Sequence, residues 1–241
     1  MKISIITVCY NSVNTIERTI KSVLNQDYPD FEYIIVDGDS NDGTLDIIKK
    51  YQESIILISE PDNGIYDAMN KGINIATGEI IATLNSDDCY HSSNVLSRIA
   101  LKYKKLNQRA IIHGNLLYID GNSEKVKKPD LRKDRLLRGP VYFQPTMFVP
   151  KVFYNESGLL DVRYKIAADY ELMLRFYLER RPFVYIDEII TEMYSGGESD
   201  NKVLQGYREC YQITLEKKVN KLTSTYSYLK RCVFYYIDSL F

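Results

Sequence analysis

The sequence predicts an α/β fold with a mainly parallel central sheet and helices on both faces. In the first half of the 241-residue chain, short apolar runs alternate with longer segments of helical periodicity, an order typical of parallel sheets. Three of the apolar runs end in polar clusters, which begin after Val8, Val36 and Leu84. Because ligands bind beyond the carboxyl ends of parallel strands, these clusters are expected to share one crevice.

The first half supplies four expected strands and four expected helices. The strands are short runs rich in Ile, Val and Leu, at residues 3–8, 33–36, 55–58 and 80–84. The first helix carries Ile16, Ile20, Val23 and Leu24 at helical spacing, with Asn11 and Ser12 as cap candidates before it. The other helices are expected at residues 45–51, 66–76 and 95–106, and Gly78 follows the second of these.

The second half is less regular. Strands are expected at residues 111–118, 146–149, 183–186 and 189–193, and a helix at 170–178. Residues 125–138 are basic and are expected at the surface, whereas residues 195–201 form a Gly-rich polar loop. From Lys202 the pattern is helical, so we expect an α/β domain over residues 1–200 and a helical extension over 201–241.

Composition excludes several classes of protein. A net charge of -1 argues against a nucleic-acid partner that covers the molecule. The four cysteines are far apart and form no Cys-x-x-Cys pair, so neither a zinc site nor a disulfide framework is indicated. The N-terminus resembles a strand rather than a signal peptide, and no apolar run reaches the ~20 residues of a membrane span. A cytoplasmic location is therefore expected.

The polar cluster Asn85, Ser86, Asp87 and Asp88 carries the strongest chemical signal. Two adjacent carboxylates directly after a buried strand are costly in a core unless they are paired. They suit a helix cap for the following segment, and they equally suit a hard divalent cation with oxygen ligands. The sequence alone leaves both interpretations open.

The other two clusters are weaker signals. Residues 37–44 form an Asx-rich turn in which Asp37 ends a strand, and such a carboxylate can accept a hydrogen bond from a base or a ribose. Tyr10 ends the first strand and can stack on a nucleobase, although a tyrosine often packs under a loop instead. Neither a dinucleotide-binding G-x-G-x-x-G nor a P-loop is present.

Together these segments resemble the GT-A nucleotide-diphospho-sugar transferase fold of inverting family-two glycosyltransferases of the bacterial surface-polysaccharide type. The matching stretches are ISIITVCYNSVNTIERTIKSVLNQDYPDFEYIIVDGDSNDGT, EPDNGIYDAMNKGINIATGEIIATLNSDD and GLLDVRYKIAADYELMLR. They occur in the family's order, and the resemblance covers about residues 1–197. It implies transfer of a sugar from a UDP-sugar to the hydroxyl of a carbohydrate or lipid-linked acceptor.

The resemblance also implies donor-binding residues. Tyr10 matches the position near the donor's uracil, and Asp37 matches a carboxylate that contacts base or ribose. Asn85, Ser86 and Asp87 occupy the family's D-x-D motif, with Asn in place of the first Asp. The remaining implied donor contacts are Val8, Asn11, Asp39, Asp67, Asn70 and Lys71.

A divalent cation, Mn²⁺ or Mg²⁺, is implied as cofactor. Asp87 is the expected metal ligand, and Asp88 is the second candidate. Many relatives supply a further His ligand from the loop after the last strand, but residues 194–199 contain no His. The glycines of this loop suit a mobile lid whose backbone N–H groups meet phosphate oxygens.

Asp169 matches the family's general base, which would take the proton of the acceptor hydroxyl while configuration inverts. A helix N-cap is the alternative role for this aspartate, and both roles are compatible. Gln144 and Ala168 lie in stretches that resemble the acceptor side. Relatives often carry His before this Gln, where Phe143 stands here.

The tail has a helical apolar face formed by Leu229, Val233, Tyr236, Ile237 and Leu240, together with several lysines. This face would pack on the domain or on another subunit of a homo-oligomer, or it would contact the inner face of the cell membrane peripherally.

Two other functions compete with the transferase. A sugar-phosphate nucleotidyltransferase usually has a Gly-rich basic loop after the first strand, which this chain lacks. A non-catalytic nucleotide-sugar-binding or scaffolding protein would explain Asn85 and the missing His, but not the presence of both Asp87 and Asp169.

Overall fold

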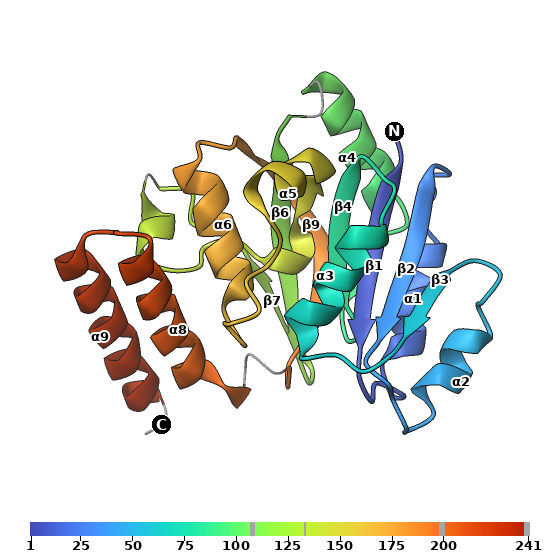
Figure 1. Cartoon of the computed structure of the whole chain (residues 1–241), viewed down its shortest axis with the longest axis horizontal. Helices are drawn as coiled ribbons and strands as arrows, with labels where there is room; N and C mark the ends of the chain where they lie inside the picture. Colours follow the sequence, from blue (N-terminus) through green and yellow to red (C-terminus); the bar gives the residue numbers. More distant parts are fainter. Residues whose placement is uncertain (107–108, 133, 198–200, 239–241) are drawn as a thin grey trace.

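The computed structural model describes residues 1–106, 109–132, 134–197 and 201–238 (Figure 1). A central sheet runs through the molecule, with helices on both of its faces and two C-terminal helices at one side. The strands are β1 (Ile3–Cys9), β2 (Phe31–Asp37), β3 (Ile56–Ser59), β4 (Ile80–Asn85), β5 (Cys89–Tyr90), β6 (Ile111–Asp120), β7 (Ser123–Lys127), β8 (Phe148–Pro150) and β9 (Phe183–Tyr194). The helices are α1 (Ile16–Leu24), α2 (Thr44–Lys49), α3 (Ile65–Ile75), α4 (Val95–Lys105), α5 (Lys151–Ser157), α6 (Ala168–Leu178), α8 (Val203–Glu216) and α9 (Lys221–Asp238).

The sheet has a parallel part and a mixed part. Strands β3, β2, β1 and β4 are neighbours in that order and pair in parallel, as expected for the first half of the chain. Beyond β4, strand β8 pairs antiparallel with both β4 and β6, and β9 runs parallel to β6. The parallel strands place their carboxyl ends at one edge, which is where the predicted polar clusters lie.

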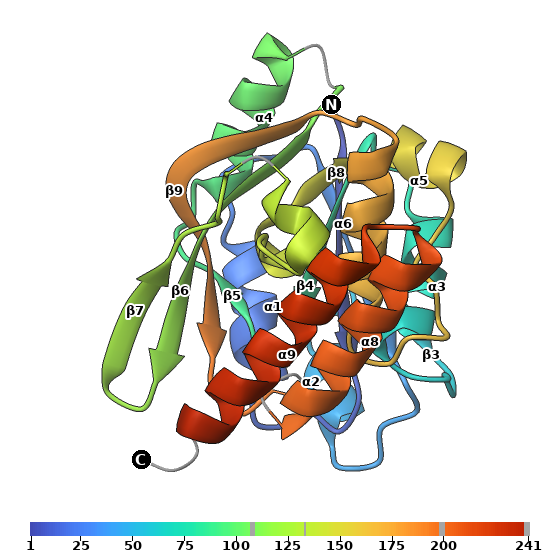
Figure 2. The same cartoon turned by 90° about the vertical axis from the view of Figure 1, so that its left-hand side faces the viewer.

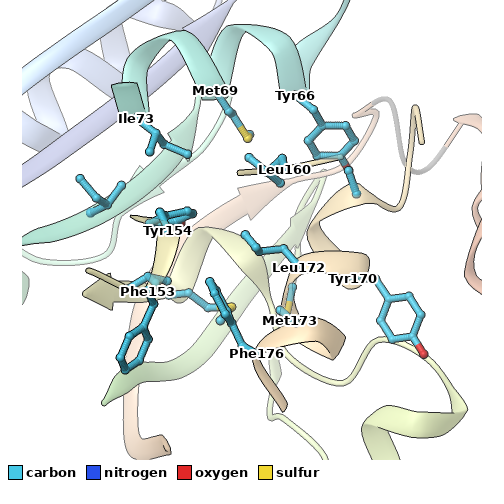
Figure 3. Close-up of a cluster of buried hydrophobic side chains, with 14 of the residues drawn as sticks. Tyr66, Met69, Ile73, Phe153, Tyr154, Leu160, Tyr170, Leu172, Met173 and Phe176 are labelled. Carbon is cyan, nitrogen blue, oxygen red and sulfur yellow. The ribbon is translucent and has the colours of Figure 1, made fainter. Parts of the chain in front are cut away.

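Side chains alternate between two cores because β1 is covered on both faces. Ile6 and Val8 join the core under α3, α5 and α6, whereas Ile3 and Ile5 join the core under α1 and α4. Figure 3 shows part of the first core, in which Tyr66, Met69 and Ile73 of α3 face Leu172, Met173 and Phe176 of α6. The alternation explains why these strands are continuous apolar runs in the sequence.

The second half differs from expectation in three places. Residues 183–194 form one strand because β6 pairs with both of its ends, with irregularities in the register between them. Helix α5 was not predicted from the sequence. The segment 125–138 is not wholly a surface excursion, because β7 pairs with β6 and the side chain of Leu136 is buried in the core.

The helical tail is present, and its first helix belongs to the body of the molecule. Cys210 and Ile213 of α8 lie in the same core cluster as α3 and α6. The division at residue 200, which stays a prediction, therefore separates segments that share one core.

Candidate functional site

The loops after β1, β2 and β4 meet at the carboxyl edge of the sheet. The Ser12 hydroxyl lies 2.9 Å from the Ser86 hydroxyl, which joins the first loop to the fourth strand's loop. The backbone N–H of Asn11 donates to the Ser40 hydroxyl at 2.8 Å, which joins the first loop to the second. These loops therefore meet at the edge of the sheet where the strand order predicts a shared site.

The first loop exposes an aromatic ring. Tyr10 is 62% exposed, whereas Val8 is buried beneath it in the core. Asn11 adopts a left-handed conformation with φ of 50°, and its side-chain oxygen accepts a hydrogen bond from the N–H of Asn41 at 3.0 Å. Because asparagine tolerates this conformation better than most residues, Asn11 stabilises the turn that presents Tyr10.

Asp37 is fully buried at the end of β2. Its carboxylate accepts hydrogen bonds from the Ser40 N–H at 3.1 Å and the Ser59 hydroxyl at 2.9 Å, and the Cys9 thiol lies 3.6 Å away. These bonds hold the second loop against β1 and β3. Asp39, two residues later, is exposed and has a left-handed φ of 68°.

Asp62, which the sequence analysis missed, lies beside Tyr10. One oxygen of its carboxylate accepts from the N–H of Gly64 at 2.7 Å. A Cβ atom on Gly38 would collide with the other oxygen and would lie 3.5 Å from the Tyr10 ring. The absence of a side chain at Gly38 therefore admits this carboxylate to the space next to the exposed ring.

The loop after β4 holds two carboxylates and an amide. Asn85 donates a hydrogen bond to Asp88 at 3.2 Å. Asp88 is almost fully buried, and burial, together with the adjacent charge of Asp87, raises the pKa of its carboxyl well above its ordinary range. The side-chain oxygen of Asn85 and the second carboxyl oxygen of Asp88, Oδ1 in each case, are buried with no hydrogen-bond donor.

The alternative role of this cluster as a helix cap is wrong. Strand β5 follows the cluster directly, and the residue before α4 is Asn94. Unsatisfied buried oxygens beside a second carboxylate suit a hard cation. The described residues contain no group of three or more His, Cys, Asp or Glu that could hold a metal alone. The residues therefore fit a cation of the Mg²⁺ or Mn²⁺ type, which commonly takes one or two carboxylates and completes its shell with substrate phosphates.

Helix α1 holds the backbone of this acidic loop from one side. The Thr19 hydroxyl lies 2.9 Å from the carbonyl oxygen of Ser86 and 2.8 Å from that of Asp88. Arg18 donates to the carbonyl oxygen of Asp87 at 2.9 Å, and its guanidinium stacks 3.5 Å from the centre of the Tyr194 ring. Arg18 therefore links the acidic loop to the end of β9.

The Gly-rich segment after β9 approaches the same carboxylate. A Cβ on Gly197 would lie 3.6 Å from Asp87 Oδ2, and Gly196 has a left-handed φ of 97°. Residues 198–200 of the predicted lid lie outside the described residues. The described residues of the predicted lid, 195–197, thus lie beside the acidic loop at Gly197.

Asp169 lies in the first turn of α6, where the residue before the helix is Ala167. Its alternative role as an N-cap is therefore wrong. The Tyr66 hydroxyl lies 3.2 Å from Asp169 Oδ1 and 2.7 Å from the carbonyl oxygen of Ile166. Burial raises the pKa of the Asp169 carboxyl, and the Tyr66 hydroxyl and the Tyr170 N–H counteract part of this effect.

Glu209 of α8 holds the segment before Asp169. Its buried carboxylate accepts from the N–H groups of Lys165, Ile166 and Ala167 at 3.2, 2.8 and 3.0 Å. Three backbone donors next to the first turn of α6 thus share one side chain from the tail.

Comparison with known proteins identifies the family. The model of glycosyl transferase family 2 matches residues 4–157, more than half of the chain. The chain belongs to glycosyl transferase family 2. It is 29% identical over 178 residues to the PGL/p-HBAD biosynthesis glycosyltransferase of Mycobacterium tuberculosis, which covers 72% of this chain and 69% of that protein. It is also 29% identical to an uncharacterized glycosyltransferase of Rickettsia typhi, over 92% of this chain and 72% of that protein.

Solved structures share the fold of this family-2 glycosyltransferase. TarS 1–349 of S. aureus, in complex with UDP-GlcNAc, superposes with a TM-score of 0.73 and 20% identity, covering 96% of this chain and 72% of that one. The mannosyltransferase PcManGT of Pyrobaculum calidifontis, in complex with GDP-Man and Mn²⁺, gives a TM-score of 0.69 and 16% identity over 96% and 73%. The expected family, GT-A fold and enzyme class are thus confirmed.

Three implied donor contacts of this glycosyltransferase hold neighbouring loops. Asn70 exchanges hydrogen bonds with the backbone of Leu160, at 2.9 and 3.0 Å. Lys71 donates to the carbonyl oxygen of Pro61 and forms an ion pair with Glu60, each at 2.8 Å. Asp67 accepts from the N–H of Asn63 at 2.9 Å. Each side chain supports a loop of the site, and its donor contact stays a prediction.

The two implied acceptor residues lie in different surroundings. Gln144 donates to the Thr83 hydroxyl, and both line a small pocket that Asp169 also lines. Ala168 is fully buried in the core, backbone included, and its contact with an acceptor stays a prediction.

Four residues near the site were not predicted, and they differ in whether the sequence could have indicated them. Asp62 and Tyr66 lie inside the stretch that carries the family resemblance, and Arg18 lies on the exposed side of an expected helix. Glu209 lies outside every matching stretch, so only the structure connects it to the site.

Proposed function

We propose that this glycosyltransferase is metal-dependent and inverting, and that it transfers a sugar from a UDP-sugar to an acceptor hydroxyl in surface polysaccharide or lipid-linked oligosaccharide synthesis. The observation that carries the proposal is the carboxyl edge of the sheet. That edge presents an exposed aromatic ring beside a carboxylate and an acidic loop with unsatisfied buried oxygens. The nucleotide-sugar complexes of TarS and PcManGT support the same class of donor.

The nucleoside end of the donor binds at the first three loops. Tyr10 stacks on the uracil, and Asp62 accepts a hydrogen bond from the base. Asp39 and Asn11 approach the ribose, as do Asn85 and Ser86 from the other side. Asp37, whose Oδ2 accepts from Ser40 and Ser59, acts by holding the loop in place.

The diphosphate end binds at the acidic loop. Asp87 and Asp88 would hold Mn²⁺ or Mg²⁺, with Asn85 Oδ1 as a further oxygen ligand. The cation supplies positive charge that stabilises the departing nucleoside diphosphate. Gly197 borders the same loop, and the left-handed Gly196 precedes it, so this glycine pair suits closure over the donor.

Asp169 is the general base. Its half-buried carboxylate accepts the proton of the acceptor hydroxyl while that oxygen attacks the anomeric carbon. The attack comes from the face opposite the departing diphosphate, so configuration inverts without a covalent enzyme intermediate. Gln144 lines the same pocket as Asp169 and orients the acceptor.

The first test is release of nucleoside diphosphate from a panel of nucleotide-sugars with Mn²⁺, with Mg²⁺ and with chelator. We expect slow metal-dependent release from one UDP-sugar and at least a hundredfold loss in Asp87→Ala, because that variant removes charge from the diphosphate site. Full activity in chelator would contradict the metal. If the enzyme releases nothing without acceptor, calorimetry with UDP-sugars replaces this assay. The proposal requires metal-dependent binding of a UDP-sugar even without turnover.

Asp169→Asn separates catalysis from donor binding. We expect transfer to fall about 10³-fold or more while the Kd for UDP stays within about threefold. Burial raises the pKa of Asp169, so its ionised form opposes folding above that pKa, and the Asn variant should be at least as stable at pH 7. Near-normal turnover in this variant would show that another group is the base.

A further inference from the structure

Helix α9 presents an apolar face to solvent. Leu222, Tyr226, Leu229, Val233, Phe234, Tyr236 and Ile237 are between 45% and 82% exposed, and we call this set the outer face. Figure 2, which looks at this side of the molecule, shows α9 in front of α8 and of the sheet. Leu240, which the sequence places on the same face, lies outside the described residues.

The opposite side of α9 makes the contacts with the protein. Tyr228 stacks on Tyr211 of α8 with ring centres 5.0 Å apart, and Ser224 is buried. The Thr225 and Tyr211 hydroxyls lie 3.1 Å apart. The helix therefore packs on the domain through this side. Such packing does not explain the apolar residues of the outer face.

The spacing of the outer face makes it continuous. Leu222, Tyr226, Leu229, Val233 and Tyr236 alternate four and three residues apart, so they form one stripe along the helix. Helices on the surface of soluble domains usually present polar residues to water, and a larger apolar patch marks a contact surface.

Charges beside the stripe indicate what this surface contacts. The described side chains of α9 include Lys221, Lys230 and Arg231 and no carboxylate, and Lys218 precedes the helix. In a second copy of this helix, Lys230 would meet a face whose described side chains, those of residues 221–237, include no carboxylate to pair with it. Cations beside an apolar stripe rich in tyrosine complement an anionic lipid surface instead.

We propose that the outer face of α9 lies on an anionic membrane surface. The apolar stripe enters the boundary between headgroups and acyl chains, while Lys221 and Lys230 contact lipid phosphates. Among the described residues no helix is long and apolar enough to cross a membrane, so the contact is peripheral. Association is reversible and weakens with salt, because its charged part is screened.

This orientation also bears on the acceptor. Helix α9 packs on α8, which lies beside α6 and its Asp169, whereas β3 and α2 lie at the far side of the molecule (Figure 1). The membrane would therefore be on the side of the proposed base. This consequence rests on the proposed function, whereas the membrane contact itself does not.

Vesicle flotation of the full chain tests the proposal. We compare vesicles of phosphatidylcholine alone with vesicles that contain about one third phosphatidylglycerol, at low and at high salt. We expect binding to the anionic vesicles at low salt, at least tenfold weaker binding to the neutral ones, and at least a tenfold loss in Leu229→Glu/Val233→Glu. The matched control is Leu101→Glu, which changes a leucine of α4 that is 61% exposed and should bind like the parent chain.

Two further measurements distinguish the outcomes. Release of UDP from a soluble donor should be unchanged in Leu229→Glu/Val233→Glu, which shows that the variant folds and separates this proposal from the proposed catalysis. Sedimentation velocity without lipid should show a monomer. A dimer that dissociates in this variant would assign the outer face to a second copy and overturn the proposal, as would a parent chain that floats with neither vesicle.

Discussion

Two side chains from other elements, Tyr66 and Glu209, shift the pKa of the Asp169 carboxyl in opposite directions. Burial raises its pKa, and the negative charge of Glu209 raises it further, whereas the hydrogen bond from Tyr66 lowers it. The net effect is a carboxylate that is a stronger base than an exposed aspartate. A base of this kind suits removal of a proton from a hydroxyl.

Tyr66→Phe tests the contribution of the hydroxyl. Since the hydrogen bond from Tyr66 lowers the pKa of Asp169, its loss should move the acid limb of the kcat–pH profile to higher pH. At the optimum pH, kcat should fall by less than about tenfold, because the proposed base itself remains. An acid limb that stays in place, with kcat reduced equally at all pH values, would show that Tyr66 is only structural.

Gly38→Ala tests the place of Asp62 beside Tyr10. The new Cβ would displace the Asp62 carboxylate, so the KM for the donor should rise about tenfold, the equivalent of one hydrogen bond. Asp62→Asn should give a similar change, since an amide can still be placed there but accepts less strongly. The Tm of both variants should stay close to that of the parent chain. Unchanged KM in both would remove Asp62 from the donor site.

At the scale of elements, the tail helix α8 holds the segment that leads to Asp169, the proposed base. Its Glu209 accepts three backbone N–H groups immediately before α6, and its Ile213 is fully buried in the core. The position of Asp169 therefore depends on a helix that follows the stretches matched to the family.

Glu209→Gln should reveal this dependence. An amide supplies one acceptor oxygen and turns an N–H group toward backbone donors, so unfolding free energy should fall by about 1–3 kcal/mol. Removal of the negative charge should also lower the pKa of Asp169 and move the acid limb of the kcat–pH profile to lower pH. The control is Glu53→Gln, which changes an exposed glutamate and should leave both measurements unchanged. A lower unfolding free energy with an unchanged kcat–pH profile would show that Glu209 has only a structural role.

At the scale of the whole molecule, the pKa values of buried acids shift in opposite directions at the two ends of the sheet. At the carboxyl end, burial raises the pKa of Asp88 and Asp169. At the other end, burial alone would raise the pKa of Glu32, but hydrogen bonds from Lys2, Ser4 and Thr77 outweigh it and lower the pKa to about 2. The acid with several donors stabilises the fold, whereas Asp88 keeps one buried oxygen without a donor and is available for a ligand.

Glu32→Gln should make stability less dependent on acid pH. A pKa lowered from 4.5 to about 2 contributes about 3 kcal/mol of stability, which is fully present above pH 4.5 and is lost as the pH falls toward 2. We expect the variant to be less stable by about 2–3 kcal/mol at pH 7 and close to the parent chain near pH 2. Urea unfolding at several pH values measures this, with the exposed Glu53→Gln as control. Parallel pH profiles of the Glu32 variant and the parent would contradict the assignment.

The sequence by itself determined the parallel half of the sheet, the family and the edge at which the polar clusters meet. Continuous apolar runs such as residues 3–8 are local signals, and the carboxyl ends of parallel strands must share one edge. It also placed Asp87, Asp88 and Asp169 within motifs whose spacing is characteristic of the family.

Only the tertiary structure decided which side chains are available and which are occupied. Asp37 and Asn70 use their oxygens within the protein, and Asp62 enters the site only because Gly38 leaves space for it. Glu209 reaches the segment before Asp169 from about forty residues away in sequence. The outer face of α9 is exposed because the other side of that helix packs on α8. Hydrogen bonding and burial depend on contacts between segments that are distant in the sequence. Periodicity along the chain does not predict these contacts.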